Sequence, residues 1–369
     1  MITLKKKIRS DLHIFLGIVG TLLVIGLLFI YSASSIFALE KFGQSHYFVK
    51  KQLVGLVLGI LGLVLIQMFP LQLIKKITPF FFWGSLGLTS LTLVHPFAVH
   101  IHGSSRWINL FGLSFQPSEL LKIAFIMYLA YFLAKKERNL SSLWHTYIPF
   151  IVILGSTCAM LLKQPDFGLT VTLFITSFIL LFIAHIPTKH MVISALGLIP
   201  VVIALIVFKP YRVQRILTFL NPWIDPQGSG FQIIQSLIAI GSGNFWGVGI
   251  SHSKQKFFYL PMQHTDFIFS IIAEETGFFG SLLLISLFIL LLYFGMHIAW
   301  GLPDTFSTFT TLGFIILISL QTIINLAVTT GLVPTKGIGL PFVSYGNTAL
   351  VCNLLMVGLL INLVHAQKK

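Results

Sequence analysis

Acidic residues are scarce in this sequence: 10 Asp and Glu stand against 24 Lys and Arg in 369 residues, and charged side chains make up only 9% of the chain. Hydrophobic residues account for 56%, and 35 residues are Phe. A water-soluble domain cannot hide so much apolar surface, so the composition excludes that class and predicts a polytopic membrane protein. Each carboxylate then needs an explanation, because an acid inside or beside a membrane is costly to desolvate.

Cysteine is nearly absent as well. The two cysteines, Cys158 and Cys352, both lie within apolar runs, which argues against a disulfide framework and against a thiolate metal site. The net charge of +14 could indicate a nucleic-acid partner. No basic stripe alternates with aromatic residues in a soluble domain, however, so we expect no nucleic-acid partner.

Ten apolar runs are each close to the ~20 residues that a helix needs to cross the hydrocarbon. They are residues 13–31, 49–69, 78–95, 118–134, 145–162, 167–184, 190–208, 266–296, 306–330 and 347–364. None shows the short alternating segments of an outer-membrane barrel. The sequence therefore predicts an all-α polytopic membrane protein with about ten transmembrane helices, organised as a single membrane domain over residues 1–369.

An even number of helices places both termini on one side of the membrane. Short loops on that side carry basic residues such as Lys75, Lys76, Lys135 and Lys136, which identifies it as the cytoplasm by the positive-inside rule. The opposite side also carries many basic residues, and that excess requires a functional reason. The outer basic residues are concentrated in three segments, 102–122, 209–256 and 331–346.

The longest stretch outside the predicted spans, about 209–265, is expected to be an outer loop between the seventh and eighth helices. Turn-forming Gly, Pro and Asn residues surround a run at 231–240 that is too short to cross the membrane. This run is amphipathic enough to lie at the interface or to re-enter. A loop of this length with a helix of its own is usually functional.

Asp266 lies at the end of this loop, where the chain enters the eighth predicted helix. A structural interpretation makes Thr265 the helix cap and Asp266 a first-turn acid favoured by the helix dipole. A functional interpretation notes that this carboxylate stands beside a basic outer loop in a chain with few acids. We favour the functional interpretation.

Three glutamates lie inside predicted helices. Glu274 and Glu275 follow Asp266 by ~12 Å of helix rise, which is too far for a catalytic carboxylate pair of the glycoside-hydrolase kind. We expect both to have structural or cavity-lining roles. Glu119 and Lys122 are three residues apart and can pair on one helix face, and a lysine one turn inside the hydrocarbon indicates a polar cavity.

Arg106 and Lys336 lie in two other outer loops. Arg106 beside Trp107 is also typical of a headgroup anchor, and Lys336 could be a solvated lysine in a Gly/Pro turn. His100 and His102 lack a fixed third ligand, so they indicate a metal site only weakly. Taken together, Arg and Lys on one face suit phosphate or pyrophosphate, and a carboxylate beside them suits proton abstraction from a hydroxyl. These residues indicate transfer from a phosphate-bearing lipid onto a hydroxyl, with pyrophosphate leaving.

Longer motifs occur in order along nearly the whole chain, and they resemble the SEDS family, named for shape, elongation, division and sporulation. They are residues 102–122 (HGSSRWINLFGLSFQPSELLK), 164–168 (QPDFG), 228–249 (GSGFQIIQSLIAIGSGNFWGVG), 255–269 (QKFFYLPMQHTDFIF) and 334–346 (PTKGIGLPFVSYG). The segments Gln255-Lys256 and Pro334-Thr335-Lys336-Gly337 look more like the division branch (FtsW and its sporulation relative) than the elongation branch (RodA).

The resemblance implies a peptidoglycan glycosyltransferase that polymerises lipid II at the outer face of the bacterial cytoplasmic (inner) membrane during septal wall synthesis. It also implies a class B penicillin-binding protein as the transpeptidase partner, with other division or elongation proteins. The family's catalytic aspartate corresponds to Asp266. Candidate substrate contacts, from motif positions and the basic outer loop, are Arg106, Lys122, Asp166, Arg212, Arg215, His264 and Lys336.

The sequence departs from the division branch close to Asp266. Met262-Gln263 replace a Glu-Ala pair, and Phe258 replaces an acid often found eight residues before the catalytic aspartate. We therefore expect no metal site formed by the protein alone and no organic cofactor. A divalent cation, Mg²⁺ or Mn²⁺, would arrive with the substrate pyrophosphate. The alternative function is a flippase for lipid-linked precursors, which is expected to place ionisable residues near the midplane on broken helices.

Overall fold

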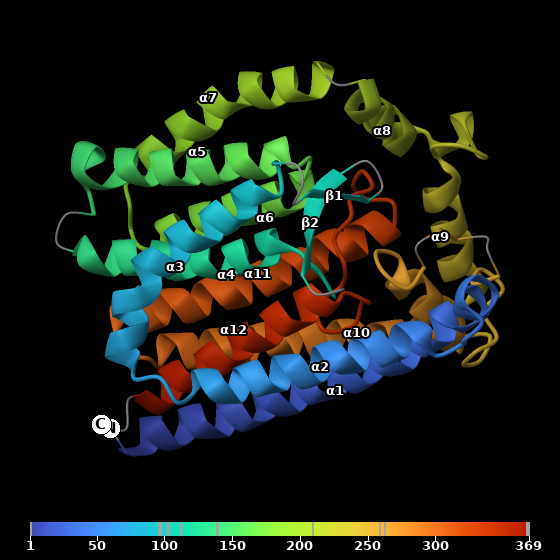
Figure 1. Ribbon diagram of the computed structural model, residues 1–369, viewed down its shortest axis with the longest axis horizontal. Coiled ribbons are helices and arrows are strands. Elements are labelled where there is room, and N and C mark those ends of the chain that lie inside the picture. The colour runs from blue at the N-terminus through green and yellow to red at the C-terminus, as the bar shows by residue number, and fades with distance from the viewer. Residues whose placement is uncertain are drawn as a thin grey trace.

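The structure is a computed structural model that describes residues 2–94, 98–101, 104–110, 113–137, 140–208, 210–257, 260–261 and 263–366. Long helices run side by side from one end of the molecule to the other (Figure 1). In chain order the elements are α1 Ile2–Phe42, α2 Tyr47–Ile66, α3 Leu71–Leu91, β1 Ala98–Ile101, β2 Ser104–Leu110, β3 Leu113–Phe115, α4 Pro117–Lys135, η2 Leu143–Tyr147, α5 Ile148–Lys163, α6 Phe167–Ile183, α7 Thr188–Val207, α8 Pro210–Leu220, η3 Pro222–Ile224, α9 Phe231–Ser242, α10 Ile268–Trp300, α11 Thr305–Thr329 and α12 Asn347–His365.

Each of the ten predicted spans coincides with a helix, from α1 to α7 and from α10 to α12. Within the described residues, seven helical segments are long and apolar enough to cross a membrane, and α6 and α7 contain shorter apolar helices. The start of α1 and the end of α12 lie at the same end of the bundle (Figure 1). The predicted all-α polytopic membrane fold is confirmed.

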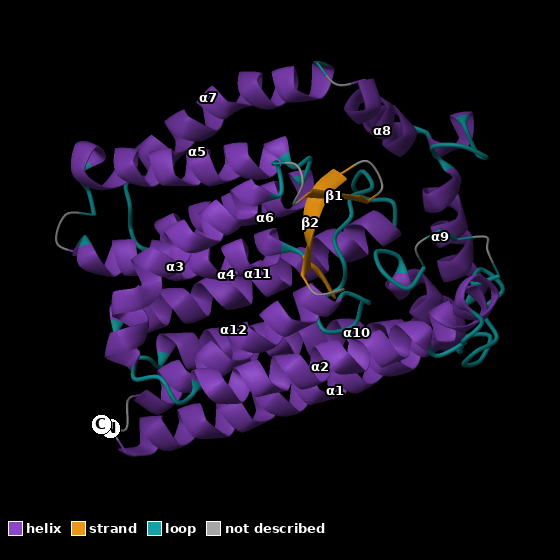
Figure 2. Ribbon diagram, in the orientation of Figure 1, coloured by secondary structure: helices purple, strands orange, loops and turns teal. Residues whose placement is uncertain are grey.

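A small antiparallel sheet, in the order β1-β2-β3, joins α3 to α4. In Figure 2 its strands are drawn near the centre of the view, between the chain termini at the lower left and α9 at the right. Trp107 of β2 pairs with Val99 of β1, and Ile108 of β2 pairs with Phe115 of β3. An outer loop was predicted for this connection, and it contains a sheet that was not predicted. The sheet fixes the backbone on both sides of Arg106.

The long outer loop contains two helices and a short 3-10 turn. The run predicted at 231–240 forms α9, and α9 ends where the glycine-rich segment begins, so the prediction of a short helix is confirmed. The segment 210–220 forms α8, which the sequence analysis did not predict. In α8, Arg212 and Arg215 are one turn apart and therefore share one side of the helix.

Helix α10 is broken at Gly277, where φ is 67° and ψ is −160°. This region of backbone space is open essentially to glycine alone. The break divides α10 into a half-helix, residues 268–276, and a long segment, residues 278–300, which rises roughly 34 Å at 1.5 Å per residue. The long segment is therefore sufficient on its own to cross a hydrocarbon core of about 30 Å.

Backbone groups freed by this break pair with the segment 244–249. Val248 and Gly249 donate to the carbonyls of Glu274 and Glu275 at 3.0 and 3.1 Å, and Phe278 donates to the carbonyl of Asn244 at 2.8 Å. Gly247, with φ 79°, lies so close to the carbonyl of Glu275 that a Cβ there would be 2.2 Å from its oxygen. The backbone N–H and C=O groups at the break are therefore hydrogen-bonded inside the protein, as a break in a membrane helix requires.

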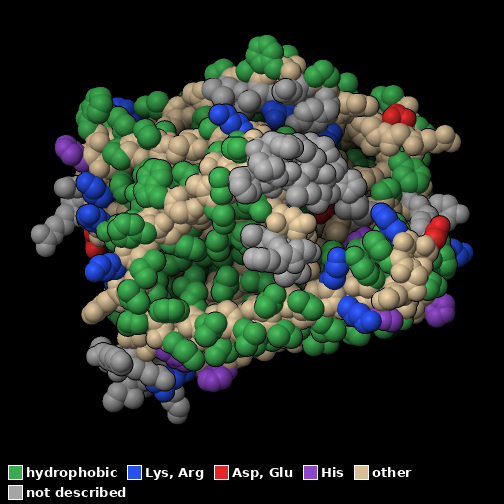
Figure 3. Space-filling view, viewed as in Figure 1, with side chains coloured by type: hydrophobic (Ala, Val, Ile, Leu, Met, Phe, Trp, Pro, Cys, Tyr) green, Lys and Arg blue, Asp and Glu red, His purple; other side chains and the backbone are tan. Residues whose placement is uncertain are grey.

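Most buried side chains are apolar and form one continuous core through the bundle. On the face seen in Figure 3, hydrophobic side chains cover much of the middle, and Lys and Arg side chains lie toward the left and right ends and along the upper edge. This distribution is that of a helical bundle whose middle faces lipid.

Candidate active site

Asp266 lies in the turn immediately before α10, and its side chain is half-buried. The structural interpretation of this residue is wrong in its details. The N-cap of α10 is Phe267, no side chain caps this terminus, and the first turn contains no acid. The position of Asp266 is set instead through its backbone, because the buried amide of Asn325 in α11 donates to the Asp266 carbonyl at 2.8 Å.

The segment 335–345 is fastened to the chain beside Asp266. The same Asn325 amide donates to the Ile338 carbonyl at 2.8 Å, the Ser344 hydroxyl donates to the Thr265 carbonyl at 2.6 Å, and the backbone N–H of Tyr345 donates to the His264 carbonyl at 3.0 Å. These bonds hold the last outer loop and the turn at Asp266 as one rigid unit.

Burial raises the pKa of the Asp266 carboxyl to about 6, and the positive charges of Arg106 and Arg215 act in the opposite direction. The carboxyl is thus ionised at neutral pH with a proton affinity well above that of an exposed aspartate. A general base works best when its pKa is close to the operating pH. The environment of Asp266 suits it to accept a proton.

Arg106 on β2 reaches the turn that precedes α6. Its Nε donates to the carbonyl of Gln164 at 3.1 Å, its Nη2 donates to the carbonyl of Pro165, and its Nη1 lies 3.7 Å from Oδ1 of Asp166. Asp166 is the N-cap of α6 and accepts from the backbone N–H of Leu169 at 3.2 Å. Burial raises the pKa of the Asp166 carboxyl, against the opposing charge of Arg106.

The aromatic ring of Phe167, the first residue of α6, contacts two cations. Lys336 Nζ lies 4.7 Å from the ring centroid, and the guanidinium carbon of Arg212 lies 5.8 Å from it. Arg215, one turn after Arg212 in α8, donates to the carbonyl of Thr335 at 3.3 Å. Burial lowers the pKa of Lys336. Helix α8 is therefore attached to the last outer loop by its basic side.

Glu119 and Lys122, near the start of α4, form the predicted ion pair, with 2.6 Å between Oε2 and Nζ. Lys122 is 1% exposed, and its Nζ also lies 3.5 Å from the side-chain oxygen of Asn353 in α12. The pairing predicted from the three-residue spacing is confirmed. The two charges also contribute to the electrostatics at Asp166, so they belong to the same polar region.

His264 is placed differently from the cationic residues. It is buried, and its ring centroid lies 4.3 Å from that of Phe48 and 5.6 Å from that of Tyr345. Among the described residues, its Nδ1 has no hydrogen-bond partner. Burial lowers its pKa to about 4, so its ring is neutral at physiological pH. The structure brings it into an aromatic cluster and does not pair it with the cations.

Glu274 and Glu275 lie near the break in α10, at the far end of the half-helix from Asp266. Glu274 accepts hydrogen bonds from the Ser253 hydroxyl and, at 2.8 Å, from the backbone N–H of Lys254. Glu275 accepts from Ser32 and pairs with Lys256. These contacts agree with the structural role expected for the two glutamates.

Sequence reasoning missed Phe167, Asn325 and Gly337 as parts of this region. A Cβ on Gly337 would lie 3.4 Å from Oδ2 of Asp266, so this glycine faces the carboxylate. Phe167 and Gly337 lie inside the motifs 164–168 and 334–346, next to the predicted site residues Asp166 and Lys336. That closeness in sequence was the available signal. Asn325 lies in an apolar helix, where a side-chain amide is itself a signal of a buried polar contact.

The donor set at Asp266 does not fit a metal site formed by the protein alone. Over the described parts of the chain, no group of three or more His, Cys, Asp or Glu side chains could hold a metal ion. The charged side chains that act on Asp266 are the cations Arg106 and Arg215, which oppose a second cation. The positions 258 and 262, where family acids are missing, lie outside the described residues.

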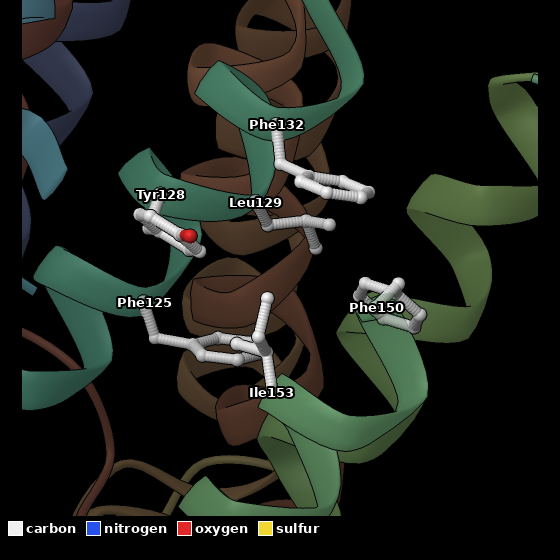
Figure 4. Close-up of a pocket in the computed structure, with 6 residues that line it drawn as sticks. All are labelled: Phe125, Tyr128, Leu129, Phe132, Phe150 and Ile153. Atoms are coloured by element: carbon white, nitrogen blue, oxygen red, sulfur yellow. The ribbon is translucent and has the colours of Figure 1, made fainter. Parts of the chain in front are cut away.

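One hollow in the described structure is lined mostly by apolar side chains of α4 and α5, namely Phe125, Tyr128, Leu129, Phe132, Phe150 and Ile153 (Figure 4). Its lining contains no carboxylate and no cationic side chain.

Comparisons with known proteins agree with this geometry. Residues 12–369 match the family model FTSW_RODA_SPOVE, described as cell cycle protein. A relative in Trichlorobacter lovleyi named "Probable peptidoglycan glycosyltransferase FtsW" is 42% identical over 96% of this chain and 92% of its own length. "Stage V sporulation protein E" of Bacillus subtilis is 40% identical over 97% of each chain.

Two solved structures share the fold over 96% of this chain and 97% of their own. One, described as "Structural coordination of polymerization and crosslinking by a peptidoglycan synthase complex", has a TM-score of 0.77 at 29% identity. The rod shape determining protein RodA of Thermus thermophilus has a TM-score of 0.70 at 25% identity. With a family match over nearly its entire length and relatives at about 40% identity, this chain belongs to the FtsW/RodA/SpoVE family of cell cycle proteins.

Proposed function

We propose that this chain is a peptidoglycan glycosyltransferase that polymerises lipid II into glycan strands during division-associated wall synthesis. The observation that carries the proposal is the half-buried carboxylate of Asp266, whose pKa burial raises to about 6 against the opposing charges of Arg106 and Arg215. The name of the relative in Trichlorobacter lovleyi supports the reaction class and the division branch.

In this reaction, Asp266 takes the proton of the acceptor sugar hydroxyl as that oxygen forms a bond to the anomeric carbon of the donor. The bond from the anomeric carbon to the lipid-linked pyrophosphate breaks, and the pyrophosphate leaves with the electron pair. Arginine side chains bind phosphate oxygens through several parallel hydrogen bonds. The leaving charge would be stabilised by Arg212, Arg215 and Lys336. Arg212 and Lys336 both lie over the ring of Phe167, and Arg215 donates to the carbonyl of Thr335.

The surroundings proposed for the protein follow from the same family. The chain is a multi-pass membrane protein. We place it in the bacterial cytoplasmic membrane with both termini in the cytoplasm, and we assign it a class B penicillin-binding protein as partner. The fold likeness to the peptidoglycan synthase complex supports a partner of this kind. No step in the proposed reaction depends on a metal ion held by the protein alone.

One observation favours the alternative, a flippase for lipid-linked precursors: α10 is broken, as helices often are in transporters. The freed backbone groups are paired with the segment 244–249 rather than left to coordinate a cargo. The break is thus fully accounted for without transport.

Purified protein with fluorescent lipid II, assayed with and without a cognate penicillin-binding protein, tests the proposal. We expect glycan strands on a gel from the wild type and none from Asp266→Asn, which is nearly isosteric but cannot accept the proton. Wild-type protein that moves labelled lipid II across vesicles without forming strands would establish the flippase instead. Strand synthesis at an unchanged rate by Asp266→Asn would refute the role of the carboxylate.

A further inference from the structure

The half-helix 268–276 connects Asp266 to the break at Gly277, and its far end is held by a buried charged cluster. Lys256 Nζ lies 3.3 Å from Oε1 of Glu275, and the Ser32 hydroxyl donates to both oxygens of the same carboxylate at 2.6 and 2.8 Å. Lys256, Glu275 and Ser32 are each at most 3% exposed. We call these three residues the Glu275 clamp.

The clamp joins three parts of the chain that are distant in sequence: α1 through Ser32, the outer loop through Lys256, and the half-helix through Glu275. A neighbouring contact adds to it, because Glu274 accepts from the Ser253 hydroxyl and from the backbone N–H of Lys254. A buried ion pair is weak evidence for stability, since desolvation opposes its Coulombic attraction. A buried ion pair is better understood as a contact that holds one particular packing of the segments it joins. At a break in a helix such a contact is needed, because the orientation of the two parts is no longer set by helical hydrogen bonds.

Gly277 makes this fastening necessary. Helical hydrogen bonds do not continue through the break, and the groups freed there pair with the segment 244–249. The spanning segment 278–300 therefore cannot by itself set the orientation of the half-helix. Asn325 holds the chain just before the half-helix, at the Asp266 carbonyl, and Ser270 in the first turn shares a 2.6 Å hydrogen bond with Ser236 of α9. The Glu275 clamp holds its end.

A helix of nine residues is stiff over its length of roughly 13 Å, so a displacement at Glu275 is transmitted to the turn at Asp266. Proton transfer to a base is sensitive to misplacement on the scale of 1 Å. We propose that Lys256 and Glu275 are positioning residues, whose buried pair sets the placement of the half-helix and thereby of the Asp266 carboxylate. The kinetic part of this proposal rests on the proposed glycosyltransferase function, whereas the structural part does not.

The chain supplies a matched control on the same two helices. Asp11 of α1 and His297 of α10 lie 2.6 Å apart, on the other side of the break at Gly277. The Ser32–Glu275 and Asp11–His297 contacts both join α1 to α10. Only Glu275, which Lys256 of the outer loop also contacts, lies in the half-helix. Loss of the Asp11 contact should therefore weaken helix packing without moving Asp266.

The first measurement is the kinetics of strand synthesis by Glu275→Gln, Lys256→Met, Lys256→Arg and Asp11→Asn, each purified as a monodisperse species with its thermal unfolding midpoint recorded. We expect kcat to fall roughly 10- to 100-fold in Glu275→Gln and Lys256→Met with little change in KM. Lys256→Arg, which keeps the charge, should recover most of kcat, and Asp11→Asn should stay near wild type.

The second measurement does not depend on catalysis. In a background with Cys158→Ala and Cys352→Ala, Asp266→Cys reports the position of this residue through its rate of modification by a water-soluble thiol reagent. Adding Glu275→Gln should change that rate several-fold, and adding Asp11→Asn should not.

The two measurements separate the possible failures. One outcome is that the wild type forms strands while Glu275→Gln changes neither kcat nor the labelling rate of Asp266→Cys. That result would overturn the positioning proposal and leave the proposed glycosyltransferase function intact. Equal effects of Glu275→Gln and Asp11→Asn on labelling would also overturn it, because the clamp would then be ordinary packing. If the wild type forms no strands but Glu275→Gln alone changes the labelling, the proposed function fails and the positioning role is supported.

Discussion

Gly337 lies against the Asp266 carboxylate: a Cβ built on the glycine would be 3.4 Å from Oδ2. This is ordinary van der Waals contact, so an added methyl group fits without strain but covers one side of the carboxylate. We expect Gly337→Ala to keep the wild-type unfolding midpoint and to lower kcat/KM for lipid II roughly tenfold.

Gly346→Ala is the control for this experiment. A Cβ there would lie 3.5 Å from the Cβ of Ala349 and would not approach Asp266. Its kcat/KM should stay within about twofold of wild type, a difference that is small beside the tenfold expected at Gly337. An equal loss in both variants would mean that the loop, rather than access to the carboxylate, is being disturbed.

The rate of strand synthesis should depend on the ionisation of Asp266. The carboxyl accepts a proton only when ionised, so the rate should fall as the pH is lowered through about 6, the pKa of the group. The charge of Arg215 lowers this pKa, and Arg215→Gln should therefore move the acid limb of the pH–rate profile to higher pH. Initial rates at saturating lipid II between about pH 5 and 8 measure this shift.

Lys254→Gln tests whether that shift is specific. Lys254 is exposed in the same outer loop, and its charge is not among the causes of the Asp266 pKa. The acid limb of this variant should coincide with that of the wild type. A limb that stays in place in Arg215→Gln, or moves equally in Lys254→Gln, would show that Arg215 does not act on Asp266.

Arg106 and Lys336 should respond differently to substitution. Arg106→Ala removes the guanidinium beside the buried Asp166 carboxylate and the arginine donor to two carbonyls, which should cost about 1–3 kcal/mol of unfolding free energy as well as activity. Lys336→Met keeps an apolar contact with Phe167 but removes a charge that burial already disfavours. It should raise KM while leaving the unfolding midpoint unchanged or higher.

Thermal unfolding followed by kinetics on the folded fraction separates these two effects. Phe178→Leu, on the same helix as Phe167 but in contact with Phe174, controls for general changes in α6. A stability loss in Lys336→Met as large as that in Arg106→Ala would identify Lys336 as a structural residue.

Divalent cations should bind weakly to the substrate-free protein. Mg²⁺ and Mn²⁺ prefer carboxylate oxygens, and the side chains that act on Asp266 are arginines. Titration calorimetry with Mn²⁺ should show dissociation constants nearer millimolar than micromolar. Micromolar binding that disappears in Asp266→Ala would reveal a site completed by another acid, with Asp166 the first candidate.

The helical spans were predicted well from the sequence, because a membrane-spanning helix requires a long apolar run that is easily recognised. It also predicted the pairing of Glu119 with Lys122, since a three-residue spacing is a local property. The sheet around Arg106 was missed, because three strands of three to seven residues leave no periodic signal of useful length. The position of His264 in an aromatic cluster was missed for another reason, namely that its neighbours Phe48 and Tyr345 come from opposite ends of the chain.

The break at Gly277 also separates the segment that is inserted into the membrane from the segment that carries the site. Residues 278–300 are long and apolar enough to be integrated into the membrane as one unit, so the half-helix 268–276 need not take part in integration. The turn at Asp266 can then tolerate charged and polar substitutions without a penalty at the translocation machinery. Variants of the carboxylate should accordingly reach the membrane in normal amounts and topology, and their defects should appear only after assembly.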